Sequence, residues 1–197
     1  MVDWRKKIIV ESLKRVIPPE YRQLSFSSIQ MPEHVARKII DWMRQPQSIL
    51  MLMGPPGTGK TALMSLIYRQ MVWEHFEQMK WTTHHEITTK LKQFISEHAD
   101  DNYYKSDLMS YKYLFIDDFG NIEYNTGWQK DRVTEIIYER SLDPDKPTII
   151  STNLTQQEVL EKYGARVDSR LFRNRNQIIN FWECGDYRKT QEVNPWK

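Results

Sequence analysis

Short apolar runs alternate with amphipathic segments along the chain, and this alternation predicts its secondary structure. Where apolar residues recur every three or four positions we expect helices, over 3–16, 32–44, 61–76, 86–98, 128–141 and 155–163. Short, mostly apolar runs between them predict strands over 48–53, 79–83, 113–116, 147–151 and 177–182. Strands that alternate with helices in this way indicate an α/β fold with a parallel sheet covered on both faces.

Several residues mark where these elements begin and end. Asp3 is suited to cap the first helix, the Pro18-Pro19 pair ends it, and Gly164 is suited to close the last one. The segment 100–110 is polar, and we expect an exposed loop there.

One glycine-rich segment carries the clearest chemical signal. The sequence GPPGTGKT from Gly54 to Thr61 fits G-x-x-x-x-G-K-[ST] at every fixed position, between a predicted strand and a predicted helix. Glycines let such a loop curl so that its N–H groups point at an anion, and the helix adds its positive end. An ordinary glycine turn is the alternative, but a full match in this context rarely arises by chance. The predicted nucleotide-binding residues are Gly54, Pro55, Pro56, Gly57, Thr58, Gly59, Lys60, Thr61 and Ala62.

A phosphate loop predicts an apolar strand that ends in acids, and YLFIDDFG supplies it. Lys60 is expected to reach the β- and γ-phosphates, and Thr61 and Asp117 to hold Mg²⁺. Asp118 would polarise the attacking water. The alternative is a strand that ends in two solvated acids before a glycine turn.

Two further segments offer candidate polar groups. Asn153 follows the apolar strand in PTIISTN, where its amide could hold the lytic water or the γ-phosphate, or could serve only as a turn residue or helix cap. Arg166 and Arg170 share one face if their segment is helical, so either could act as an arginine finger on a neighbouring subunit. A solvated basic face is equally consistent with the sequence.

Composition narrows the class of protein. The 197 residues are 40% apolar and carry 28 basic against 26 acidic side chains, which suits a folded domain and gives no strongly basic signal of nucleic-acid binding. The single cysteine, Cys184, excludes an internal disulfide and a cysteine-rich zinc site. The adjacent histidines at 84 and 85 are poor evidence of a metal site. No membrane span or secretory signal is recognisable, so we expect a cytoplasmic protein.

These motifs, in this order, resemble the AAA+ ATPases. Within them the chain looks most like the branch of bacterial replicative-helicase loaders (DnaC type) and transposition helper ATPases (IstB type). The segments that carry the resemblance are IPPEYRQLSFSSI, GPPGTGKT, YLFIDDFG, PTIISTN, GARVDSRLF and NFWECGDYRK. The resemblance implies a P-loop NTPase three-layer sandwich with a five-stranded parallel sheet.

Roles follow from the resemblance position by position. It implies that Lys60 and Thr61 bind ATP and its Mg²⁺, and that Asp117 holds the metal through water. It also implies that Asn153 is the sensor and that Arg170, with Arg166 as second choice, is the finger. The resulting catalytic set is Lys60, Asp118, Asn153 and Arg170.

Three departures from the family pattern affect what we expect. Asp118 stands where most AAA+ proteins have glutamate, which would weaken water activation. We expect residues 1–17 to form a helix able to dock a partner, 18–189 the ATPase core, and 190–197 a tail. This expected division has neither the usual helical lid nor a large N-terminal docking domain. The apolar stripe of the first helix, with Trp4, Ile8 and Ile9, could bind a partner or simply pack on its own core.

The resemblance implies an ATP-hydrolysing helicase loader in DNA replication, weakly active without a partner. A replicative helicase, single-stranded DNA and other copies of this chain are the expected partners, the last on ATP binding. Candidate DNA contacts are Lys90, Lys92, Tyr103, Tyr104 and Lys105, although an exposed helix and loop would look the same. The alternatives are a transposition helper, a nucleotide-binding adaptor without turnover, and a small-molecule kinase. The kinase lacks support because no arginine-rich lid follows the phosphate loop region in this sequence.

Overall fold

The computed structural model describes residues 4–29, 31–96, 101–124 and 127–184. Within them a five-stranded, all-parallel sheet has the strand order β2-β3-β4-β1-β5, which confirms the predicted fold class. The strands are β1 (Ile49–Met53), β2 (Met79–Thr83), β3 (Tyr113–Phe119), β4 (Thr148–Thr152) and β5 (Gln177–Asn180).

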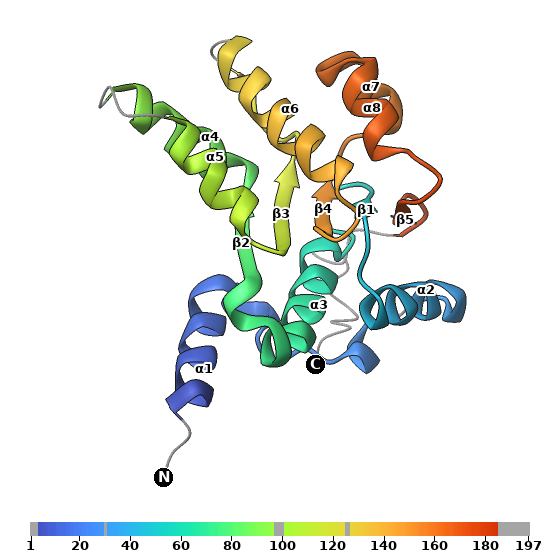
Figure 1. The fold of residues 1–197 in the computed structure, drawn as a ribbon. Helices are drawn as coiled ribbons and strands as arrows, with labels where there is room; N and C mark the ends of the chain where they lie inside the picture. Colours follow the sequence, from blue (N-terminus) through green and yellow to red (C-terminus); the bar gives the residue numbers. More distant parts are fainter. Residues whose placement is uncertain (1–3, 30, 97–100, 125–126, 185–197) are drawn as a thin grey trace.

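Helices cover both faces of this sheet (Figure 1). They are α1 (Trp4–Val16), α2 (Glu33–Arg44), α3 (Lys60–His75), α4 (His84–Ser96), α5 (Asp101–Ser110), α6 (Gly127–Leu142), α7 (Gln156–Tyr163) and α8 (Ala165–Leu171). Short 3-10 turns lie at Pro19–Tyr21, Phe26–Ser28 and Phe76–Gln78.

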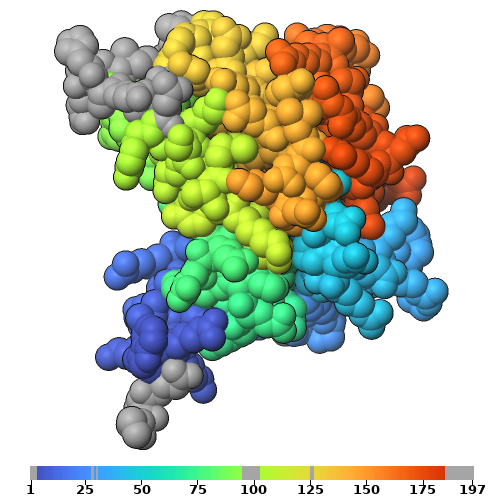
Figure 2. All heavy atoms as spheres, viewed as in Figure 1, coloured from blue at the N-terminus to red at the C-terminus, as the bar shows by residue number. Residues whose placement is uncertain are grey.

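The two faces of the sheet have separate apolar cores. Alternate residues of β1 divide between them, so that Leu50 and Leu52 pack with α1, α2 and α3. Met51 and Met53 pack on the other face with residues of α4 to α8. Because every residue of β1 is buried, its sequence is continuously apolar, as expected for a central parallel strand. In the view of Figure 2, α1 lies at one end of the molecule, away from α6, α7 and α8.

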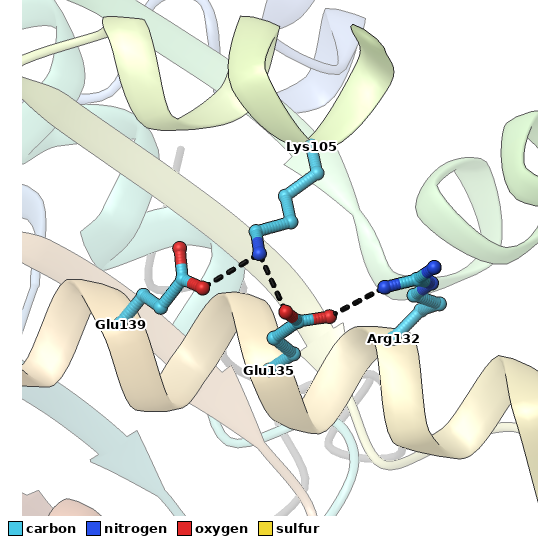
Figure 3. Close-up of polar contacts among 4 residues, drawn as sticks. All are labelled: Lys105, Arg132, Glu135 and Glu139. Carbon is cyan, nitrogen blue, oxygen red and sulfur yellow. Dashed lines mark hydrogen bonds and ion pairs between the residues drawn. The ribbon is translucent and has the colours of Figure 1, made fainter. Parts of the chain in front are cut away.

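The prediction of a loop over 100–110 is wrong for the described part of that segment, because Asp101–Ser110 forms α5. Tyr104 and Leu108, one helical turn apart, are buried in the second core. Lys105 bridges α5 to α6, with its Nζ 2.6 Å from carboxylate oxygens of both Glu135 and Glu139 (Figure 3). Tertiary packing therefore stabilises a helix that its polar sequence did not predict.

The predicted element boundaries hold to within a few residues. Pro32 and Thr155 cap α2 and α7 from outside, and Thr155 forms a capping box with Glu158. Gly164 closes α7 with a positive φ of 81°, as its type predicted. The proposed cap Asp3 lies outside the described residues.

The apolar stripe of the first helix was expected either to pack on the core or to bind a partner, and its residues divide between the core and the surface. Ile9 is buried in the core, whereas Trp4 and Ile8 are exposed. No helix among the described residues has the length and apolar character needed to span a membrane.

Candidate nucleotide-binding site

The glycine-rich loop joins the carboxyl end of β1 to the first residue of α3. Gly57 and Gly59 have φ values of 82° and 92°, a left-handed conformation in which a side chain would be strained. The loop curls around the buried ammonium of Lys60, whose Nζ donates to the carbonyl oxygens of Gly54 at 2.7 Å and Pro55 at 2.6 Å. The Thr58 hydroxyl also donates to Pro55, at 2.9 Å. The local sequence thus forms a cradle at the positive end of a 16-residue helix.

Gly54 fixes this cradle against the sheet. Its N–H donates to the carbonyl oxygen of Thr152 at 3.2 Å, which ties the loop to the end of β4. A Cβ at Gly54 would lie 2.6 Å from the Cβ of Phe181 and 2.9 Å from its carbonyl carbon. Glycine is therefore required where the loop passes the chain just beyond β5.

A β-bulge separates the two acids of β3. Ile116 pairs with Ile150 and Phe119 with Thr152, so β3 fits one more residue than β4 into the same interval. Asp118 has a φ of 52° and is exposed, whereas Asp117 is buried. The bulge gives adjacent carboxylates two different environments, and the sequence had no signal for it.

Asp117 is bound by groups from three elements. Its Oδ1 accepts hydrogen bonds from the hydroxyls of Thr61, at 3.2 Å, and Ser151, and from the N–H of Asp118 at 3.1 Å. Burial raises the pKa of this carboxyl, and the neighbouring Asp118 adds to the rise, while the hydrogen bonds oppose it.

Sequence reasoning missed Ser151. Its Oγ also accepts from the N–H of Asp118 at 2.9 Å, so it supports both acids. The signal was available: a hydroxyl near the carboxyl end of β4 lies beside β3 if the two strands are neighbours. Only the sheet order shows that β3 and β4 are neighbours.

The arrangement offers oxygen ligands of the type that Mg²⁺ prefers. Thr61 Oγ1 and Asp117 Oδ1 meet at the carboxyl edge of the sheet, where open α/β sheets bind ligands. Asn153 follows β4 directly and is half-buried. The sensor role of Asn153 stays a prediction.

The predicted finger residues lie on α8, and both stack on one aromatic ring. The guanidinium carbons of Arg166 and Arg170 lie 3.8 Å and 4.8 Å from the ring centroid of Tyr138 in α6. Arg170 also donates to the Tyr138 hydroxyl at 3.3 Å, and the two arginines, Arg166 first, lower the pKa of Tyr138. The structure gathers Arg170 with Arg166 and Tyr138, not with the phosphate loop of its own chain.

The candidate DNA contacts fall into two groups. Tyr104 is 4% exposed and Lys105 is held by two carboxylates, so neither side chain is free to contact DNA in the way that we predicted. Tyr103 is 73% exposed and Lys92 is exposed as well, while Lys90 lies over the ring of Tyr104.

Comparisons with known proteins agree with this architecture. The DnaC helicase loader has a TM-score of 0.68 at 19% identity, covering 83% of this chain and 99% of that chain. Domain III of the Thermotoga maritima replication initiation protein DnaA has a TM-score of 0.67 at 18% identity, covering 83% and 68%. A replication initiator DnaA bound to AMPPCP and single-stranded DNA has a TM-score of 0.66 at 15% identity, covering 83% and 50%. At these identities the likeness concerns the fold.

No curated protein matches the sequence. The family model described as the bacterial DnaA ATPase domain matches residues 24–175, which include the phosphate loop, both acids and the two arginines of α8. The chain therefore belongs to the family of bacterial DnaA ATPase domains, and it shares its fold with the DnaC helicase loader.

Proposed function

We propose that this protein binds ATP with Mg²⁺ at the Gly54–Thr61 loop, hydrolyses it, and acts as a helicase loader in DNA replication. The observation that carries the proposal is the meeting of Thr61 with Asp117, 3.2 Å apart, beside the curled loop around Lys60. The likeness to the DnaC helicase loader over nearly all of that chain supports the cellular role. The similar DnaA that binds AMPPCP and single-stranded DNA supports the ligands.

Each group has a distinct part in the proposed reaction. Loop N–H groups and the Lys60 ammonium bind the β- and γ-phosphates and neutralise their charge. Thr61 and Asp117 hold the Mg²⁺, which when bound polarises the phosphate oxygens. Asp118 and Asn153 orient the attacking water. Asp118 is exposed and directly follows the buried Asp117, so it can accept a hydrogen bond from a water molecule close to the metal-binding residues.

The Lys60→Ala variant tests the nucleotide site. Removing the ammonium is expected to lower ATP turnover by roughly a hundredfold or more and to weaken binding of a fluorescent ATP analogue. The exposed Lys38 of α2 gives a matched control, Lys38→Ala, which removes the same charge elsewhere. Unchanged affinity and turnover in Lys60→Ala would refute the assignment.

ATP-dependent self-association is the second part of the proposal. We propose that Arg170 reaches the γ-phosphate on a neighbouring copy, with Arg166 and Tyr138 supporting its orientation. Arg170→Ala is then expected to retain nucleotide affinity but to lose roughly a thousandfold in turnover under assembling conditions. Mixing Arg170→Ala with Lys60→Ala should restore activity, since each copy supplies what the other lacks. A monomer with full turnover would exclude a finger supplied in trans.

Partner capture separates the helicase loader from its rivals. Co-purification with a hexameric helicase in the presence of ATP would support loading, whereas co-purification with a transposase would indicate a transposition helper. A protein that binds ATP but shows no turnover, with no change in Asp118→Ala, would be an adaptor. Phosphate transfer to a nucleoside or metabolite would instead identify a kinase.

A further inference from the structure

The loop that follows the two acids is fixed at one residue, Gly120, by both of its backbone polar groups. The Gly120 N–H donates to Nδ1 of His84 at 2.8 Å, and its carbonyl oxygen accepts from Nζ of Lys162 at 2.7 Å. Lys162 also donates to the carbonyl oxygen of Ile122 at 2.6 Å. Two side chains from α4 and α7 therefore hold the chain only two residues beyond Asp118.

His84 lies at the start of α4 and is fully buried. Because its Nδ1 accepts from a backbone N–H, the neutral ring carries its proton on Nε2. That nitrogen lies 2.7 Å from the Tyr124 hydroxyl, which in turn donates to the hydroxyl of Tyr163 at 3.2 Å. The ring also stacks on Phe119, with centroids 5.2 Å apart. Both ring nitrogens of His84 are therefore engaged, Nδ1 with the loop over residues 118–122, called the acid loop below, and Nε2 with Tyr124.

Asp118 needs such support. Its φ of 52° lies in the left-handed region, where a residue with a side chain is strained and persists only if its surroundings enforce it. The bond from His84 to Gly120 limits rotation of the chain just after the bulge. Without that bond Asp118 could relax toward an ordinary conformation, which would change the direction of its carboxylate.

We propose that His84 is a positioning residue for ATP hydrolysis, which holds Asp118 in its productive orientation through the Gly120 N–H. This inference rests on the proposed function, because Asp118 has a role to be positioned for only if the site hydrolyses ATP. The partners of His84 described above are Gly120, Tyr124 and Phe119, and since none of them belongs to the phosphate loop, its loss is expected to act on the rate of the chemical step and to leave binding intact.

Three variants test the proposal in the full-length protein with saturating ATP, Mg²⁺ and a single-stranded oligonucleotide. His84→Leu removes both hydrogen bonds, and kcat is expected to fall by roughly tenfold to a hundredfold while affinity for a fluorescent ATP analogue stays within about twofold. His84→Asn keeps an acceptor near the position of Nδ1 and should recover part of that rate. His85→Asn, at the neighbouring exposed histidine, is the matched control and should behave as wild type.

The outcomes distinguish this inference from the proposed function. Full kcat in a folded His84→Leu protein, next to an active wild type, would overturn the positioning role alone. A wild type that binds but does not hydrolyse ATP would overturn the proposed hydrolysis and this role with it. If His84→Leu melts too early to assay, His84→Asn decides: affinity and kcat that fall together would mean a purely structural residue, and a fall in kcat alone supports positioning.

Discussion

The phosphate loop and the acid loop lie at the same edge of the sheet but are stabilised in different ways. The curl of the phosphate loop is held by its own residues, because Lys60 and Thr58 donate to carbonyls no more than six positions away, while the bond from the Gly54 N–H to Thr152 ties the loop to the sheet. The acid loop is bonded by His84 and Lys162, which lie 36 and 42 positions from Gly120 in the sequence. A contiguous motif can specify the first loop, whereas only the complete fold specifies the second.

The glycines of the two loops also differ, in the atoms that a side chain at each position would meet. A side chain at Gly54 would meet backbone atoms just beyond β5, and a side chain at Gly120 would meet the side chain of Leu154. Backbone in a sheet moves only with its strand, while a leucine can change rotamer. Substitutions at these two positions therefore compare a rigid surrounding with an adaptable one.

Gly54→Ala is expected to have the largest effect on stability. The new methyl group would lie 2.6 Å from Phe181 Cβ and 2.9 Å from its carbonyl carbon, so the end of β5 must move away from β1. The free energy of unfolding is expected to fall by roughly 3 kcal/mol, which urea denaturation measures. A loss below about 1 kcal/mol would mean that β5 is more loosely held than its pairing with β1 indicates.

The extent of sequence prediction follows the same division. Apolar periodicity and the glycine motif were enough for the alternating elements, the parallel sheet and the phosphate loop, because these depend on neighbouring residues. The bulge at Asp118, the hydroxyl of Ser151 on Asp117 and the burial of Tyr104 depend on which strands and helices become neighbours. No single segment carries that information, so the sequence alone predicts a loop where α5 lies and gives Ser151 no role.

The acid loop should also be the more sensitive of the two to pH. Burial, with Lys162 and then His85 adding to it, lowers the pKa of His84 to about 4. The unfolded chain takes up this proton near its ordinary value of about 6.5, before the folded protein does, so stability falls as the pH drops from there toward 4. Between about pH 7.5 and about pH 5 this one group is expected to cost roughly 2 kcal/mol.

Comparing the wild type with His84→Asn isolates the contribution of His84 to this pH dependence, because the carboxylates that titrate in the same range are present in both proteins. The tyrosine hydroxyls of Tyr124 and Tyr163, which complete the network, stay protonated throughout, since burial raises the pKa of both. Denaturant midpoints across this range should converge for the two proteins as the pH falls. Parallel curves would mean that the folded and unfolded states take up this proton at the same pH, so that burial does not keep the ring of His84 neutral.

Gly120→Ala is expected to have the smallest effect of the three. Its φ of 89° strains any residue with a Cβ, and the methyl group would lie 2.9 Å from Leu154 Cγ and closer still to Cδ1. Since that leucine can rotate, we expect a loss of about 1 kcal/mol in unfolding free energy. Gly127→Ala is the matched control, because a Cβ there meets no described atom within 4 Å, and it should leave stability nearly unchanged. If Gly120→Ala instead cost as much as Gly54→Ala, the acid loop would be as rigid as the phosphate loop, and its long-range bonds from His84 and Lys162 would hold it as firmly as a local motif does.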